Sequence, residues 1–527
     1  MDRMPSAPSL SSERIAAEDF VAEFRANAER LAAAGLYDPA QERDACGVGF
    51  IAALDGKSSR AVVASALLAL KAIFHRGAVD ADGRTGDGAG IHVQIPHAFF
   101  RQHIKRIGHE PKEDILAVGM LFLPRTDMAG QERCRVIVES EILKFGYTIY
   151  GWRQVPVHTE ALGEKANATR PEIEQIMIAN SRGVDAEQFE IDLMVIRRRI
   201  EKAALAAAIP DFYVCSLSSR SIIYKSLCLA EQLTEFYPDL LDERFVSNFA
   251  VYHQRYSTNT FPTWRLAQPF RVIAHNGEIN TLSGNVNWMK SHEPRLASPK
   301  FGQQIEDLKP IVQLGSSDSA ALDSVFELVI RAGRDLPAAK ALLVPEAAAN
   351  NQLLSDEVKA LYSYFNAIME PWDGPAALAA YDGRWVLGGM DRNGLRPMRY
   401  SITKDGLLIA GSEAGMVRLP EEDVVEKGRL GPGQMIAVDL VEGRLWRDTE
   451  LKEMLAKRRN YRKWIRNIVH LEKVAGRDVS ETAELEREEL RRRQLAAGWT
   501  IEDLETVLQP MAEDGKEPVG SMGDDAP

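Results

Sequence analysis

Residues 44–50 read Asp-Ala-Cys-Gly-Val-Gly-Phe, and they place Cys46 at the head of the first apolar run of the chain. A polar segment precedes this run, and Ala45 is a small residue. Cleavage before Cys46 would leave one residue with both a thiol and a free α-amine, and an amine with a pKa of about 8 can act as the base for that thiol. The alternative is a core cysteine at the start of a strand, because free cysteines are mostly buried. The stretch therefore favours either a processed N-terminal nucleophile or an ordinary buried strand.

The bulk composition limits the classes of protein that this chain can belong to. Its 527 residues are enough for two to four domains, and its 45% hydrophobic and 27% charged residues are typical of globular proteins. The 64 Lys and Arg against 76 Asp and Glu give a net charge of −12. An acidic chain is poorly suited to nucleic acid or to an anionic membrane surface, so we expect neither as a partner.

The cysteines and the N-terminal segment indicate a reducing compartment. Four cysteines are scattered through the chain without a Cys-x-x-Cys pair or a Cys/His cluster, so neither a disulfide framework nor a metal site is predicted. The first 45 residues carry acids throughout and have no uninterrupted apolar core, unlike a secretory signal. No stretch has the apolar length of a transmembrane helix. We expect a cytoplasmic protein.

Short strand patterns alternate with helical patterns along the chain. Many of the strands are joined by turns, which favours antiparallel or mixed sheets covered by helices, an α+β fold. After about residue 445 the chain becomes highly charged and helix-prone, which predicts an external helical segment. Strands are predicted at 46–54, 91–95, 115–123, 147–155, 212–217, 222–225, 249–256, 271–275, 377–381, 385–390 and 407–411, and helices at 60–74, 131–144, 169–181 and over most of 280–364.

Four glycine-punctuated polar motifs are candidates for chemistry. A cysteine that acts on a carboxamide with an amino-acid head group needs an arginine for the carboxylate, an acid for the ammonium and two donors for the oxyanion. Arg76 or Arg255 supplies the arginine, Asp318 the acid, and Asn276 with Gly277 the donors. The motifs are Phe-His-Arg-Gly at 74–77 with the glycine-rich run 80–90, His-Gln-Arg-Tyr-Ser-Thr-Asn-Thr at 253–260, Ile-Ala-His-Asn-Gly-Glu-Ile-Asn at 273–280, and Gly-Ser-Ser-Asp-Ser at 315–319.

Each of these residues also has a purely structural interpretation. An Asn-Gly pair after a strand is often a turn, Asp318 suits the first turn of a helix, and Arg76 suits a helix C-terminus. Their joint occurrence in this order is harder to assign to chance, and it favours a site.

The motifs together resemble the class II glutamine amidotransferase domain of the glutamate synthases. The resemblance runs from Tyr37 to the end of the chain, and Phe-His-Arg-Gly followed by Gly-Asp-Gly-Ala-Gly is its most specific part. Pro-Trp-Asp-Gly-Pro-Ala at 371–376 and Asp-Arg-Asn-Gly-Leu-Arg-Pro at 391–397 fit the same pattern. Residues 512–518, Ala-Glu-Asp-Gly-Lys-Glu-Pro, look like the start of the central domain of that family.

The resemblance implies a role for each candidate residue. Cys46 would be the nucleophile, Asn276 and Gly277 would form the oxyanion hole, and three residues would hold the glutamine head group: Arg76, Arg255 and Asp318. The implied fold is an N-terminal-nucleophile αββα sandwich. The implied division is a leader at 1–45 that is removed, an amidotransferase domain at 46–445, and a helical linker with the start of the central domain at 446–527.

The same resemblance implies a glutaminase whose ammonia serves reductive transfer to 2-oxoglutarate in glutamate biosynthesis. Complete members carry FMN and a 3Fe-4S cluster, but this chain shows no cluster motif, so we expect a partial chain without a cofactor of its own. Its expected partners are L-glutamine, the missing central and FMN domains, and a small NAD(P)H-dependent subunit. Two alternatives stay open: a class II amidotransferase for another acceptor, and an unprocessed module that binds glutamine without turnover.

Overall fold

The computed structural model describes residues 22, 26–35, 46–111, 115–256, 261–313, 315–469, 471, 474 and 485–518. Most of the predicted leader, and residues 257–260 of the second polar motif, lie outside these ranges. Contacts divide the chain into two compact units, Met1–Ile465 and Arg466–Pro527. All strand pairs of the described part are antiparallel, and they form three sheets in the first unit.

Two of the sheets carry the candidate site. The first has seven strands in the order β14-β12-β13-β1-β8-β2-β7, and the second has five in the order β16-β15-β11-β10-β9. The seven strands are β1 (Gly47–Ala53), β2 (Ala89–Gln94), β7 (Ser221–Ser226), β8 (Phe249–Gln254), β12 (Arg399–Thr403), β13 (Leu407–Gly411) and β14 (Val424–Arg429). The five are β9 (Ile273–Gly277), β10 (Ala376–Tyr381), β11 (Trp385–Met390), β15 (Met435–Asp439) and β16 (Arg444–Trp446).

These two sheets pack face to face between layers of helices. Alternate residues of β1, such as Val48 and Phe50, meet Ala377 and Ala379 of β10 in one apolar cluster. Helix α2 (Arg60–Ala72) covers the outer face of the first sheet, and α10 (Asp318–Arg331), α11 (Leu336–Leu343) and α12 (Asp356–Ile368) pack on the second. The predicted α+β class and αββα sandwich are confirmed by this layering.

Local sequence explains why α2 forms where it does. Ser59 accepts a hydrogen bond from the backbone N–H of Val62 and so caps the first turn. Val62, Ala66 and Leu70 follow at four-residue spacing, and all three are buried. This apolar stripe faces the first sheet and fixes the helix against β1 and β8.

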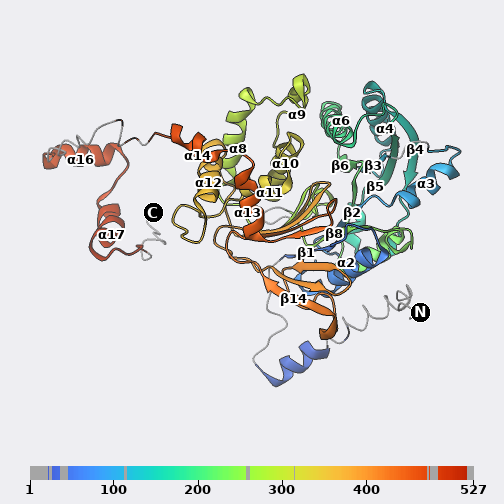
Figure 1. The fold of residues 1–527 in the computed structure, drawn as a ribbon, viewed down its shortest axis with the longest axis horizontal. Helices are drawn as coiled ribbons and strands as arrows, with labels where there is room; N and C mark the ends of the chain where they lie inside the picture. Colours follow the sequence, from blue (N-terminus) through green and yellow to red (C-terminus); the bar gives the residue numbers. More distant parts are fainter. Residues whose placement is uncertain are drawn as a thin grey trace. The chain divides into compact units, whose positions relative to one another are not determined.

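A four-stranded sheet, in the order β4-β5-β3-β6, forms the rest of the first unit. The helix predicted over 169–181 is wrong, because residues 172–179 form β5, an interior strand between β4 and β3. Pairing on both sides and burial of nearly all its residues override the helical pattern. Figure 1 shows α4 and α6 beside this sheet. Its elements are β3 (Leu116–Leu123), β4 (Thr148–Gln154), β5 (Glu172–Ala179), β6 (Tyr213–Ser218), α4 (Met128–Lys144) and α6 (Ala186–Ala206).

Helices connect and follow these sheets. The charged region predicted after residue 445 contains helices in its described part, the first of them α13 (Asp448–Lys457). No helix in the described ranges combines the length and apolarity needed to cross a bilayer. The remaining helices are α3 (His97–Arg106), α5 (Glu164–Ala168), α7 (Leu233–Phe236), α8 (Leu282–His292), α9 (Ile305–Leu308), α13 (Asp448–Lys457), α14 (Tyr461–Trp464), α16 (Arg487–Ala496) and α17 (Gln509–Asp514).

Candidate active site

Cys46 stands at the entrance of β1, and the strands on either side fix its position. The backbone of Gly47 pairs with Gln254 of β8. On the other side, the N–H of Ser412 donates to the carbonyl oxygen of Val48 at 2.8 Å. Cys46 itself is only 4% exposed. Cys46 is therefore held in the interior by the contacts of the strand that follows it.

The surroundings of the Cys46 thiol make it a weak acid. Burial raises its pKa to about 12 and outweighs the neighbouring charges, of which Arg255 and Arg396 lower the pKa while Asp87 and Asp318 raise it. The thiol is thus protonated near neutral pH and needs a base to become a nucleophile. The same charges show that both Arg255 and Asp318 lie close enough to act on the sulfur.

Asn276 reaches Cys46 from the second sheet. Its Nδ2 atom donates to the carbonyl oxygen of Cys46 at 2.8 Å. The next residue, Gly277, ends β9 with φ of 157°, and a Cβ at this position would collide with the carbonyl oxygen of Pro375. Only glycine therefore fits there. The Asn-Gly pair is part of a strand and not the tight turn that was its structural alternative.

The Arg255 side chain is held by Asp87, an acid that the sequence analysis quoted within a motif but to which it gave no role. Its Nε atom donates to Oδ2 of Asp87 at 2.6 Å, and its backbone N–H donates to the carbonyl oxygen of Gly88. The other oxygen of Asp87 accepts from the N–H of Ala78 at 3.1 Å. Burial raises the pKa of Asp87 to about 6, although Arg255 opposes the shift. The glycine-rich run 80–90 was the only sequence signal for this acid.

Asp318 is the first residue of α10, so its helix-terminal interpretation and its place near the site both hold. Ser317 caps the helix by accepting from the N–H of Ala320. The Asp318 carboxylate accepts from the N–H of Ile279 at 2.9 Å and from the N–H of Ser319 at 2.7 Å. These bonds join the start of α10 to the segment that follows β9.

Arg76 has a different partner. It ends a short 3₁₀ turn, Phe74–Arg76, and its Nε atom donates to the carboxylate of Glu413. The Nε2 atom of His75 lies 3.0 Å from the same carboxylate. The named charge effects on the Cys46 thiol come from other residues, and one of them is Arg396, which the sequence analysis did not single out.

Comparison with known proteins adds to this geometry. Residues 46–464 match the model of the family described as glutamine amidotransferases class-II. The chain belongs to this family. Residues 492–527 match the glutamate synthase central domain.

Individual relatives of this amidotransferase are much longer than it is. It is 62% identical over 520 residues to the glutamate synthase [NADPH] large chain of Azospirillum brasilense, covering 98% of this chain and 34% of that one. It is 46% identical to ferredoxin-dependent glutamate synthase 2 of Synechocystis sp., covering 92% of this chain and 31% of the relative. The chain thus spans about a third of the length of these relatives. A solved structure of the allosteric regulatory enzyme of purine biosynthesis aligns with 43% of this chain and 40% of its own, at 18% identity and a TM-score of 0.25.

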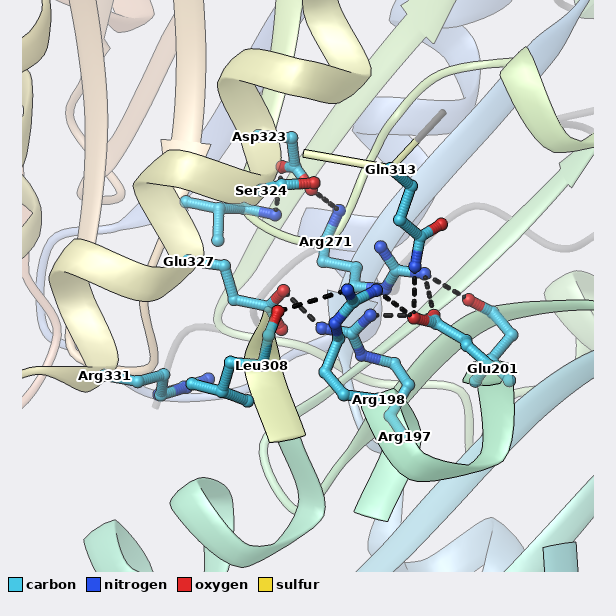
Figure 2. Close-up of polar contacts among 12 residues, drawn as sticks. Arg197, Arg198, Glu201, Arg271, Leu308, Gln313, Asp323, Ser324, Glu327 and Arg331 are labelled. Atoms are coloured by element: carbon cyan, nitrogen blue, oxygen red, sulfur yellow. Dashed lines mark hydrogen bonds and ion pairs between the residues drawn. The ribbon is translucent and has the colours of Figure 1, made fainter. Parts of the chain in front are cut away.

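A buried ionic network helps to fix the position of β9, the strand that carries Asn276 and Gly277. Figure 2 shows Arg197, Arg198 and Arg271 converging on Glu201 of α6. One oxygen of Glu201 accepts from Arg197 at 2.8 Å and Arg271 at 3.1 Å, and the other accepts from Arg198 at 2.7 Å and Gln313 at 2.6 Å. Burial acts to raise the pKa of Glu201, but the three arginines lower it to about 2.

The network continues into the strand that carries Asn276. The backbone N–H groups of Arg271, Val272 and Ile273 all donate to the carboxylate of Asp323 on α10, at 3.2, 2.8 and 3.0 Å. Together with the bond from Ile279 to Asp318, these contacts tie both ends of β9 to one helix. The position of β9 therefore depends on α10 and, through Arg271, on Glu201.

Replacing Glu201 with Ala is expected to destabilise the amidotransferase strongly. The change leaves three buried arginines without their shared carboxylate, and breaking a buried pair in this way costs about 3–5 kcal/mol. Urea unfolding should show this loss in the free energy of unfolding. The control is Asp307→Ala, which removes a partly exposed partner of Arg199 and should cost about 1 kcal/mol or less. Equal effects of the two substitutions would contradict a supporting role for the network.

Proposed function

We propose that this amidotransferase hydrolyses L-glutamine to L-glutamate and ammonia, with Cys46 as the nucleophile after removal of residues 1–45. One observation carries the proposal: the Nδ2 atom of Asn276 lies 2.8 Å from the carbonyl oxygen of Cys46. This bond uses one N–H of the Asn276 amide and holds the amide of one sheet beside the nucleophilic residue of the other. The second N–H of the same amide is the donor that we assign to the oxyanion.

The chemistry explains why processing matters. A thiol with a pKa of about 12 is inert near neutral pH, and in the unprocessed chain the nitrogen of Cys46 belongs to a peptide bond. Cleavage converts it into an amine, which accepts the thiol proton as Sγ attacks the carboxamide carbon. The Asn276 amide and the Gly277 N–H then stabilise the oxyanion. The amine returns the proton to the leaving nitrogen, ammonia departs, and water hydrolyses the thioester to glutamate.

The same surroundings supply a binding site for the amino-acid head group. Arg255 forks onto the α-carboxylate, and its Nε contact with Asp87 sets the orientation of the guanidinium plane. Asp318 accepts from the α-ammonium group. Arg76 is a further candidate for the carboxylate, through exchange of its bond to Glu413.

For the complete protein we propose that the ammonia serves reductive transfer to 2-oxoglutarate in a cytoplasmic glutamate synthase. In this proposal the transfer uses parts of the longer relatives that this chain does not cover, together with FMN, a 3Fe-4S cluster and a small NAD(P)H-dependent subunit. The described residues do not fit the cluster, because they contain no group of three His, Cys, Asp or Glu side chains that could hold a metal. Two alternatives are an amidotransferase for another acceptor and a glutamine-binding module without turnover.

The test compares two forms of the chain, one that retains Met1 and one whose N-terminus is Cys46, each verified by intact mass. Only the second form should release glutamate and ammonia from glutamine, because only it has the α-amine. Addition of 2-oxoglutarate should leave its rate unchanged, because none of the residues proposed for the glutamine site is assigned to that acceptor. Equal activity of both forms would contradict the amine as base, and binding without turnover in the processed form would favour the non-catalytic alternative.

A further inference from the structure

The strand that carries Asn276 lies at an edge of its sheet. β9 pairs with β10 on one side, where Asn276 is opposite Ala377 and Ala274 is opposite Ala379. In an antiparallel pair, residues whose backbone groups bond across the pair alternate with residues whose backbone groups point outward. His275 is of the second kind, because its N–H and C=O groups bond to a side chain outside β10. A buried edge must satisfy such groups with other partners, because unpaired N–H and C=O groups are costly.

A side-chain amide provides these partners. The Oε1 atom of Gln268 accepts from the N–H of His275 at 2.8 Å, and its Nε2 atom donates to the carbonyl oxygen of His275 at 3.1 Å. Gln268 thus repeats with one side chain the pair of bonds that a neighbouring strand would make. The Nε2 atom of His253, on β8 of the other sheet, lies 3.1 Å from the same carbonyl oxygen. Gln268 is 1% exposed, so water does not compete for these bonds.

We propose that Gln268 is a positioning residue for glutamine hydrolysis. It fixes the His275 peptide and thereby the orientation of the Asn276 amide and the Gly277 N–H. The inference rests on the proposed function. A rotation of the His275 peptide would carry the next two residues with it, and a displacement of about 1 Å at a reacting group can cost about 10²-fold in rate.

The effect should fall on the chemical step and not on binding of the head group. The Arg255 side chain is held by Asp87, and Asp318 by Ile279 and Ser319, and none of these bonds involves Gln268. His253 links the two regions, because its Nε2 atom contacts the His275 carbonyl oxygen and its Nδ1 atom lies 3.0 Å from the carbonyl oxygen of Arg255. That link reaches the backbone of Arg255 and not its guanidinium group. Loss of the Gln268 amide should therefore lower kcat while leaving affinity for the amino-acid head group intact.

The test uses Gln268→Met, which keeps the length of the side chain and removes both bonds, in the processed chain. We expect kcat for glutamine to fall about 10- to 100-fold, with the inhibition constant for glutamate within about twofold of the unmodified chain. Glutamate is informative because it carries the same head group without the reacting carboxamide. A second variant, Gln268→Glu, keeps the acceptor for the His275 N–H but lacks the donor for its carbonyl oxygen, so kcat should fall here too.

Gln131→Met is the matched control. The Nε2 atom of Gln131, on α4, donates to the carbonyl oxygens of Pro124 and Arg125 at 2.9 and 3.0 Å, and the residue is also buried. Its replacement removes the same number of buried backbone bonds far from β9 in the fold. We expect a similar drop in Tm and an unchanged kcat.

The outcomes separate the two proposals. An unmodified processed chain without glutaminase activity would refute the proposed function itself. An active chain whose folded Gln268 variants keep kcat within twofold would overturn the positioning role, as would a raised inhibition constant with unchanged kcat, or an equal loss of kcat in Gln131→Met. If Gln268→Met does not fold, Gln268→Glu decides by the same criterion.

Discussion

Replacing Cys46 with Ala in the processed chain should abolish glutaminase activity while leaving the fold intact. In the proposed mechanism the Sγ atom of Cys46 forms the thioester, and loss of a covalent nucleophile removes the reaction path itself, so we expect a decrease of about 10³-fold or more. The measurement is release of glutamate and ammonia, with circular dichroism to verify the fold. Ammonia release near the unmodified rate would refute Cys46 as the nucleophile.

The other buried cysteines offer a control for this prediction. Cys215→Ala removes a thiol that is equally buried, on β6 of the separate four-stranded sheet, and should leave the rate unchanged. A diazoketone analogue of glutamine should label Cys46 and spare Cys134, Cys215 and Cys228, since only Cys46 lies beside Arg255 and Asp318. Labelling spread evenly over the four cysteines would indicate nonspecific thiol reactivity.

Asn276→Ala should lower kcat by roughly 10²- to 10³-fold, the effect of removing one oxyanion donor. The Michaelis constant for glutamine should change little, because in the proposed site Arg255 and Asp318 hold the head group. Steady-state kinetics with the processed chain measures both parameters. A normal kcat with a raised Michaelis constant would make Asn276 a binding residue instead.

A comparable buried asparagine lies outside the candidate site and serves as the control. The Nδ2 atom of Asn285, on α8, donates to the carbonyl oxygen of Pro371 at 3.1 Å. Asn285→Ala should lose a similar amount of stability and keep its kcat. An equal fall in kcat for both variants would point to general loss of structure.

Patterns local in sequence were enough to predict much of the fold. The strand after Cys46, the helix predicted at 60–74 and the strands predicted at 249–256 and 377–381 all formed close to the expected ranges. The segment 169–181 did not, since β5 is a strand through pairing with β3 and β4. Its partner residues lie 49 to 63 positions away in β3, from Leu123↔Glu172 to Leu116↔Ala179, and 20 to 31 positions away in β4, from Gln154↔Glu174 to Thr148↔Ala179. A long-range pairing of this kind leaves little trace in a local pattern.

The candidate site could likewise be predicted only in part from the sequence. The polar motifs and the resemblance to a family indicated Cys46 and Asn276, and the structure joins them by a hydrogen bond. The supporting roles of Asp87 and Gln268 could not be predicted. Asp87 lies in a quoted glycine-rich motif that does not indicate its partner, and Gln268 lies in none of the quoted motifs. Their importance comes from which backbone groups the fold brings to them.

The nucleophilic residue and its amide donor stand on two different sheets, so the thickness of the apolar filling between those sheets fixes their separation. Gly388 of β11 illustrates how tightly this layer is packed, because a Cβ there would come within 2.8 Å of both Phe50 and Met398. Catalytic groups tolerate displacements of only about 0.5 Å, and a close-packed interior transmits strain. The apolar layer between the sheets thus sets the distance between these two groups. A substitution in this layer can lower the catalytic rate without unfolding the protein.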